Sequence, residues 1–239
     1  LGQRFYSPRI GKFLTQDPIG HSGGLNLYAY CDNSPLTSVD PDGTRPINES
    51  DRAILHILRA RMSNAGFSMA YQNQVTNHLK AFVASIAQGP KDPPGLTALW
   101  WAIGEVGSPA WGFDSAPRGN KCNAFVYAAY KSGSGIDLPD RKKEGWFGIG
   151  RGVQPFGADY FATESNSMKG LTVLNMGSFN PGDIVAFPKP TGSNHGHMAI
   201  LVGRGLLVYA SSKSAKLGTY ERNKAASGRN ATVRRAGEE

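Results

Sequence analysis

The sequence predicts an α+β protein, in which N-terminal helices, a cysteine-bearing helix and a small antiparallel sheet follow a short segment of strands and turns. Three observations predict this class. Short aromatic runs alternate with turn signals such as Ser-Pro, Asp-Pro and Gly-Gly over residues 1–44. Apolar residues recur at helical spacing between residues 48 and 106, and again after Cys122. Strand-like apolar runs separated by glycine turns follow between residues 181 and 211.

The composition suits a globular protein. The 239 residues are 40% hydrophobic, with 30 glycines and 15 prolines, which is enough for one or two domains with a core. No run of 18 apolar residues occurs, so we expect no membrane span. Because the chain begins at Leu1 without a methionine or a basic and apolar leader, we expect a fragment of something longer, with any export signal elsewhere.

The formal net charge of +8 favours an anionic partner, such as nucleic acid, a membrane surface or a bacterial wall polymer. The densest basic stretches are residues 141–143 and 213–235, and no aromatic ladder for stacking bases accompanies them. We therefore expect no nucleic acid among the partners. Residues 216–239 are interpreted as a loose, solvated basic tail.

The two cysteines, Cys31 and Cys122, fall in segments of different character. A pair separated in this way predicts neither a disulfide framework nor a metal knuckle. The five histidines do not stand at metal-ligand spacings. We expect no metal and no cofactor.

Three helices are predicted in a lead-in over residues 48–106. The first begins near Asn48 or Ser50, which are N-cap residues by type. Its apolar stripe consists of Ala53, Ile54, Ile57, Leu58, Arg61 and Met62. The second runs from about residue 72 to 88, and its inward residues are Val75, Leu79, Phe82, Val83 and Ile86. The third follows a proline break at residues 93–94, with the apolar residues Leu96, Leu99, Trp100 and Ile103.

Residues 1–44 carry a repeated tetrapeptide, DPIG at residues 17–20 and DPDG at residues 40–43. On local chemistry alone, Asp-Pro most simply starts a turn. The ordered pieces RFYSPRIGKFLTQDPIG, GGLNLYAYCDNSP and VDPDG closely resemble the end of the core domain of RHS-repeat proteins. The resemblance covers residues 1–44 and is specific, because the pieces occur in one order at close spacing.

This resemblance implies a shell of β-strands that encloses a C-terminal toxin, and an aspartic self-protease at the end of the shell. By that analogy Asp17 and Asp40 are the carboxylate candidates, because two nearby carboxylates can share a proton and activate a water. The cut would fall near Gly43 or Thr44. Family members usually carry an apolar residue where Thr44 stands, which leaves the position of the cut open.

Cys122 stands at the start of a predicted helix. A glycine and polar residues precede it, and Phe125, Val126 and Ala129 follow at helical spacing. Unpaired N–H groups at a helix start stabilise a thiolate. A free cysteine is also common in protein cores, so this location alone permits a nucleophile without requiring one.

A histidine strand in the second half of the chain supplies a possible base. Alternation puts His197, Ala199 and Leu201 on one face of the run HMAILV. Counting symmetrically about the turn at Arg204 pairs Ala199 with Tyr209 and would place Ser211 opposite His197. We therefore expect His197 to face Tyr209 and Ser211.

The pieces NKCNAFVYAAY, PGDIVAF and GHMAILVGRGLLVYAS together resemble the NlpC/P60 and CHAP branches of the papain-like cysteine hydrolases. The resemblance covers about residues 111–215, the expected catalytic part. It implies that Cys122 is the nucleophile and His197 the general base. The third position, usually His, Asn or Gln, falls on Tyr209, so Tyr209 orients the imidazole, Ser211 does, or a dyad suffices. His195 is a weaker candidate base.

The oxyanion would be stabilised by the backbone N–H of Cys122, with Asn120 and Asn123 as further candidates. Together the two resemblances imply an RHS effector of a type VI secretion system, with a papain-like toxin domain over residues 45–239. It would be an amidase or endopeptidase that cuts peptidoglycan peptide stems in the periplasm of a competitor. Its partners would be the RHS shell and an immunity protein. The alternatives are a protease, deamidase or acyltransferase in the target cytoplasm and, third, a non-enzymatic basic binding module.

Overall fold

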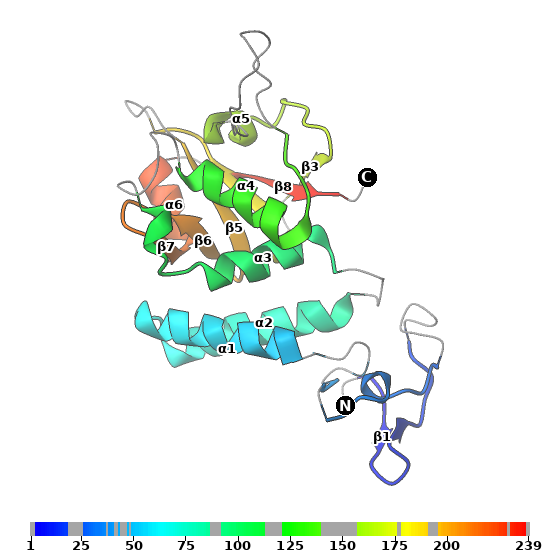
Figure 1. Ribbon diagram of the computed structural model, residues 1–239. Helices are drawn as coiled ribbons and strands as arrows, with labels where there is room; N and C mark the ends of the chain where they lie inside the picture. Colours follow the sequence, from blue (N-terminus) through cyan, green and yellow to red (C-terminus); the bar gives the residue numbers. More distant parts are fainter. Residues whose placement is uncertain are drawn as a thin grey trace. The chain divides into compact units, whose positions relative to one another are not determined.

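The computed structural model forms two compact units, residues 1–92 and residues 93–239 (Figure 1). The structure describes residues 3–18, 26–36, 38–40, 43, 47, 49–86, 92–112, 121–139, 157–175, 178–190, 196–228 and 230–237. In this part of the chain no helix is long and apolar enough to cross a membrane.

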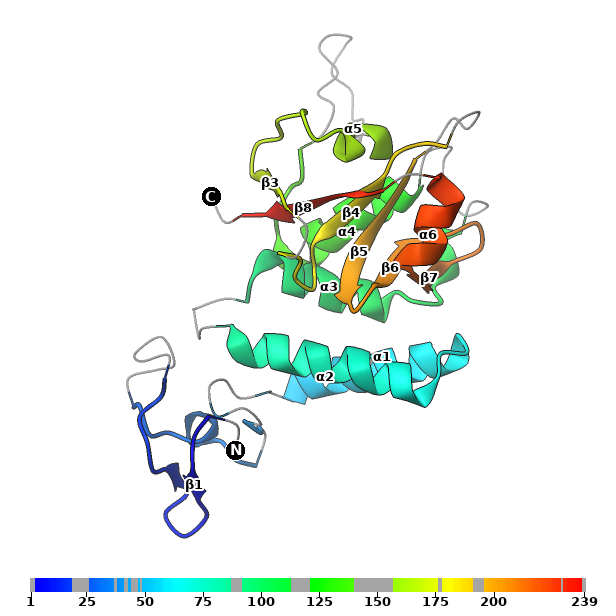
Figure 2. The ribbon, with the colours of Figure 1, turned by 180° about the vertical axis from the view of Figure 1, so that it is seen from behind.

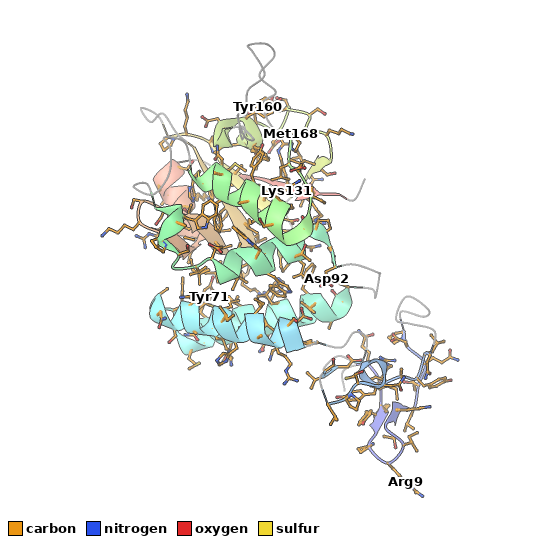
Figure 3. The ribbon with its side chains drawn as sticks, viewed as in Figure 1. Arg9, Tyr71, Asp92, Lys131, Tyr160 and Met168 are labelled. Atoms are coloured by element: carbon orange, nitrogen blue, oxygen red, sulfur yellow. The ribbon has the colours of Figure 1, made fainter. Side chains whose placement is uncertain are left out.

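The first unit begins with the predicted small strands. Strands β1 (Tyr6–Ser7) and β2 (Lys12–Phe13) pair antiparallel, and the turn between them carries Arg9 (Figure 3). Phe13 is buried and packs edge to face against the rings of Tyr6 and Tyr30. The 3-10 turn η2 (Cys31–Asn33) follows. Aromatic packing therefore holds a segment that is too short to build a core of its own.

Two helices complete the first unit, α1 (Glu49–Asn64) and α2 (Met69–Ser85), and they lie side by side (Figures 1 and 2). The expected stripe of α1 is partly wrong, because Ala53 is exposed and Leu55 is buried. Ser50 lies inside α1 and is no cap, while Asn48 lies outside the described residues. Helix α2 starts three residues earlier than expected, because the Ser68 hydroxyl accepts a hydrogen bond from the Tyr71 N–H.

The second unit contains one six-stranded antiparallel sheet in the order β3-β8-β4-β5-β6-β7. Its strands are β3 (Leu171–Val173), β4 (Ile184–Phe187), β5 (His197–Gly203), β6 (Leu206–Ala210), β7 (Ala215–Thr219) and β8 (Thr232–Ala236). Its helices are α3 (Pro94–Gly104), α4 (Lys121–Ser134), α5 (Ala158–Ala162) and α6 (Tyr220–Ser227), with a 3-10 turn η3 (Pro109–Trp111) before α4. The predicted α+β class is confirmed.

Helices α3 and α4 cover one face of the sheet, and α6 lies against the other (Figures 1 and 2). The close approach of α3 and α4 depends on Gly133, where a Cβ would come within 2.5 Å of the Thr97 carbonyl oxygen. On the α6 face, Tyr220 packs against a cluster of buried side chains. The cluster consists of Val185, Phe187, Ala199, Leu201, Leu207, Tyr209 and Val233.

The expectation of a loose basic tail over residues 216–239 is wrong. Most of these residues belong to β7, α6 and β8, and β8 lies inside the sheet between β3 and β4. Arg234 of β8 is 1% exposed. Its guanidinium donates to the carbonyl oxygens of Phe161 and Thr163, at the C-terminal end of α5. These hydrogen bonds satisfy a helix end and let an arginine occupy the interior.

Candidate active site

Cys122 lies in the first turn of α4, as predicted, and Phe125, Val126 and Ala129 are fully buried. The thiol donates a hydrogen bond to Oδ1 of the buried Asn123 at 3.3 Å. The sulfur also accepts from backbone N–H groups of Cys122, Asn123 and Met198. Because Met198 directly follows His197, the sulfur sits beside the first peptide group of β5.

Burial raises the pKa of the Cys122 thiol above its ordinary value, and the three backbone N–H groups oppose this effect without overcoming it. The helix start was expected to favour the thiolate. The expectation failed because the sequence pattern reports the nearby N–H groups but not how many protein atoms pack around the sulfur of the half-buried Cys122.

His197 is the first residue of β5, and its ring packs between two aromatic rings. The Tyr209 ring meets it edge to face at 4.6 Å between centroids, and the Phe187 ring stacks on it at 6.3 Å. Burial first, and then the positive charge of Lys216, lower the pKa of His197 to about 4. The imidazole is therefore neutral at pH 7.

The imidazole nitrogen Nε2 is buried and has no hydrogen-bond partner among the described residues. In the same part of the chain no hydrogen bond joins the imidazole to the Cys122 sulfur. A buried polar atom without a partner costs about 1–3 kcal/mol, and such atoms concentrate where a ligand or a reacting group completes the site.

The predicted register between β5 and β6 is confirmed in part: it holds at Ile200 and Leu201 and shifts at Gly203, which pairs with Leu206. Residue Ile200 pairs with Val208 and Leu201 with Leu207, which is the register that sets Ala199 opposite Tyr209. The Tyr209 hydroxyl is hydrogen-bonded to the side chain of Asn223.

Of the other predicted site residues, Ser211 is described by the structure, whereas Asn120 and His195 are not. The Ser211 hydroxyl donates to the Ser214 carbonyl at 2.8 Å, within its own turn. Asn120 and His195, predicted for the oxyanion site and as a second base, lie outside the described residues. No group of three or more His, Cys, Asp or Glu side chains that could hold a metal ion occurs in the described ranges.

The two aspartates of the repeated tetrapeptide meet at one side chain in the first unit. Arg4 contacts Asp17 through Nη1 and Asp40 through Nη2, each at 3.1 Å, and all three side chains are buried. The second oxygen of Asp40 accepts the N–H of Gly43 at 2.8 Å. Thr44 lies outside the described residues.

Several residues around these sites were missed by sequence reasoning. Arg4 stands in the quoted RFYSPRIG motif, but nothing local links it to both aspartates. Lys216 lies directly opposite Tyr209 in the β6–β7 register, and it would have been found had residues 215–219 been recognised as a strand. Asn223 and Arg222 lie on α6, where the weakly apolar sequence YERNKAAS gives no clear helical stripe.

Comparison with known proteins supports the interpretation of the second unit. Residues 109–235, more than half of the chain, match the NlpC/P60 family. The toxin subunit YenC2 of Yersinia entomophaga is 46% identical over 50 residues, which cover 21% of this chain and 5% of that protein. The double-stranded DNA deaminase toxin A of Burkholderia cenocepacia is 55% identical over 40 residues, which cover 17% and 3%. The chain thus matches only a small part of the length of these relatives.

A solved structure is also similar to this chain. It is the type VI native effector-immunity complex Tae3-Tai3 from Ralstonia pickettii, with 20% identity and a TM-score of 0.36 over 60% of this chain and 98% of that chain. The family match, together with a cysteine at a helix start beside a strand that begins with histidine, identifies the second unit. The chain belongs to the NlpC/P60 family.

Proposed function

We propose that the second unit hydrolyses amide bonds in the peptide stems of peptidoglycan, with Cys122 as nucleophile and His197 as general base. One observation carries the proposal: the Cys122 sulfur faces three backbone N–H groups at the start of α4 and beside the first peptide of β5. Family membership supports the reaction class, and the net charge of +8 suits an anionic wall polymer.

In the proposed reaction both groups begin neutral. His197 removes the thiol proton as the sulfur attacks the amide carbonyl carbon, and the oxyanion is stabilised by the Cys122 N–H and the Asn123 side chain. The imidazolium then gives its proton to the leaving amine as the C–N bond breaks. Water hydrolyses the thioester, and the thiol is regenerated. No hydrogen bond joins sulfur and imidazole among the described residues, and the imidazole lines the α6-side cavity whereas Cys122 does not. The proposed reaction therefore requires the imidazole to turn towards the sulfur when substrate binds.

The orienting role is proposed for Tyr209 in preference to Ser211. The Tyr209 ring packs on the imidazole, and its hydroxyl is held by Asn223. The Ser211 hydroxyl is already engaged with Ser214. A phenol that packs without carrying a charge would fix the ring plane of His197, whereas a carboxylate would also raise its pKa.

For the first unit we propose that Asp17 and Asp40 cut the chain close to Gly43, at the end of an RHS shell. The two carboxylates converge on Arg4, and Asp40 also holds the N–H of Gly43. The expected result is a fragment that begins near Thr44, seen by intact mass spectrometry, which disappears in Asp40→Asn. A fragment that persists in both Asp40→Asn and Asp17→Asn would reject these two residues.

The test of the cysteine compares the two thiols of the chain. Cys122→Ala should abolish toxicity, whereas Cys31→Ala removes the other thiol, from the first unit, and should leave toxicity intact once folding is verified by circular dichroism. Toxicity that survives Cys122→Ala would favour a non-enzymatic basic binding module.

The compartment in which the toxin kills tests its substrate class. We propose that a secreted effector reaches the periplasm of the target cell, where an immunity protein protects kin. Directing the chain to the periplasm of a test bacterium should kill, and retaining it in the cytoplasm should not. Killing from the cytoplasm alone would favour a protease, deamidase or acyltransferase of cytosolic proteins.

A further inference from the structure

A cavity of about 320 Å³ opens on the α6 side of His197. The residues that line it are Pro188, Pro190, Gly196, His197, Tyr209, Lys216, Arg222, Asn223, Ala226 and Ser227. The imidazole and the phenol both line this cavity and Cys122 does not, so the cavity adjoins the proposed reaction centre at its His197 end.

Two cations line this cavity. Lys216 projects from β7 directly opposite Tyr209, with its Nζ 5.5 Å from the centroid of the phenol ring. Its charge reaches the imidazole, because it helps to lower the pKa of His197. Arg222, in the first turn of α6, is close enough for its positive charge to oppose the rise in the pKa of Tyr209 that burial causes. Neither cation forms an ion pair with a carboxylate among the described residues.

The walls of the cavity are fixed by contacts of their own. The Tyr209 hydroxyl packs on Gly218, where a Cβ would come within 2.5 Å of the phenol oxygen. The Asn223 amide donates to the Thr219 carbonyl at 2.9 Å, and the Ser227 hydroxyl donates to the Pro188 carbonyl at 2.8 Å. Helix α6, which carries Arg222, is thereby tied to the end of β4, while Lys216 is held by the pairing of β7 with β6.

We propose that this cavity binds a carboxylate of the substrate peptide, which lies between Lys216 and Arg222 while the scissile amide meets Cys122. The inference rests on the proposed amide hydrolysis and adds a specificity site to it. A carboxylate would neutralise two like charges that stand beside a neutral imidazole, and charge-assisted hydrogen bonds would fix its orientation. Phosphate shares this anionic chemistry, but a ligand anchored this close to His197 has to be part of the molecule that is cut.

The test uses the double variant Lys216→Gln/Arg222→Gln of the full chain, with Lys224→Gln as matched control on the same helix but outside the cavity. Two substrates are compared at pH 8, a stem peptide with free carboxylates and the same peptide with its carboxylates amidated. His197 is neutral there with or without Lys216, so a change in its pKa cannot mimic the effect.

The unaltered protein and the control should prefer the free acid. In the double variant KM for the free acid should rise about tenfold or more, because hydrogen bonds to a charged group are lost, while kcat and the KM for the amide change little. Equal KM changes for both substrates, or none, would overturn the proposal.

A binding measurement separates this inference from the proposed function. Calorimetric titration of the free-acid peptide into the Cys122→Ala protein needs no catalysis. The affinity for the peptide should fall when the two cavity substitutions are added. Inorganic phosphate at matched ionic strength should compete no better than chloride. Phosphate that competes as well as the peptide would show a general anion site and reject a specificity site. Loss of cleavage in Cys122→Ala tests the proposed function independently.

Discussion

Burial acts in opposite senses on the two groups of the proposed catalytic pair. It raises the pKa of the Cys122 thiol and lowers that of the His197 imidazole, so each neutral form is favoured. A preformed thiolate–imidazolium pair is therefore not the resting state at pH 7. In the proposed reaction the proton therefore moves as the sulfur attacks, which makes the protonation state of His197 the limit on activity in acid.

The pH dependence of activity follows from this arrangement. His197 must be neutral to act as a base, and its pKa of about 4 keeps it neutral well below pH 6. We predict that kcat/KM stays level as pH falls towards 5 and drops as pH approaches 4. Lys216→Gln should move this acid limb to higher pH, because one cause of the lowered pKa is removed, and Lys224→Gln should not. An acid limb at the ordinary histidine value, near 6.5, would mean that the imidazole is exposed to water.

The Tyr209 hydroxyl lies so close to Gly218 that no larger residue fits there without movement. We predict that Gly218→Ala destabilises the unit by about 1–3 kcal/mol, because its Cβ would lie 2.5 Å from the phenol oxygen. Tyr209→Phe should cost about 1 kcal/mol through the lost hydrogen bond to Asn223. Urea denaturation of both variants and the double variant checks this, and the double variant should be more stable than the two losses added together. Simple additivity would mean that the hydroxyl does not meet the new methyl group.

At the scale of elements, an ion pair between Arg235 and Asp183 holds strand β8 against the start of β4. The Asp183 carboxylate is 3% exposed and receives two hydrogen bonds from the Arg235 guanidinium, both at 2.8 Å, and a third from the Asn180 N–H. Asp183 therefore fixes a turn, as the PGD sequence indicates, and also anchors β8. The ion pair between Lys131 and Asp137 is exposed by comparison, with side chains 59% and 65% exposed.

These two ion pairs give a matched prediction. Arg235→Gln should destabilise the second unit by about 2–3 kcal/mol, because it leaves a buried carboxylate without its cation. Lys131→Gln, near the end of α4 (Figure 3), should cost less than about 0.5 kcal/mol. The free energies of unfolding at pH 7 check both values. Equal losses would show that the Asp183 site is open to solvent.

Local patterns predicted the elements whose burial can be read from the spacing of their own apolar residues. The α4 spacing and the β5–β6 pairs at Ile200 and Leu201 followed from apolar periodicity and a two-glycine turn around Arg204, whereas the register shift at Gly203 did not. Strand β8 could not be found in this way, because the buried Arg234 donates to the Phe161 carbonyl and Arg235 is paired with Asp183, and both partners lie more than 50 residues earlier in the chain.

At the scale of the molecule, the structure divides the chain between α2 and α3, while the residue pattern changes near residue 45. Helices α1 and α2 carry the same kind of apolar stripe as α3, so periodicity could not show which unit each helix joins. The candidate site was predictable as Cys122, His197 and Tyr209. The cavity cations and Asn223 were not, because their proximity to His197 depends on β7 and α6.

The most direct test of the proposed function is mass spectrometry of peptidoglycan sacculi after incubation with the chain. With the unaltered protein and Cys31→Ala, one amide bond of the stem should be cut, which leaves a new carboxylate on one product and a new amine on the other. Cys122→Ala and His197→Ala, checked for folding, should release none. Intact sacculi with the unaltered protein, or the same products with Cys122→Ala, would contradict it.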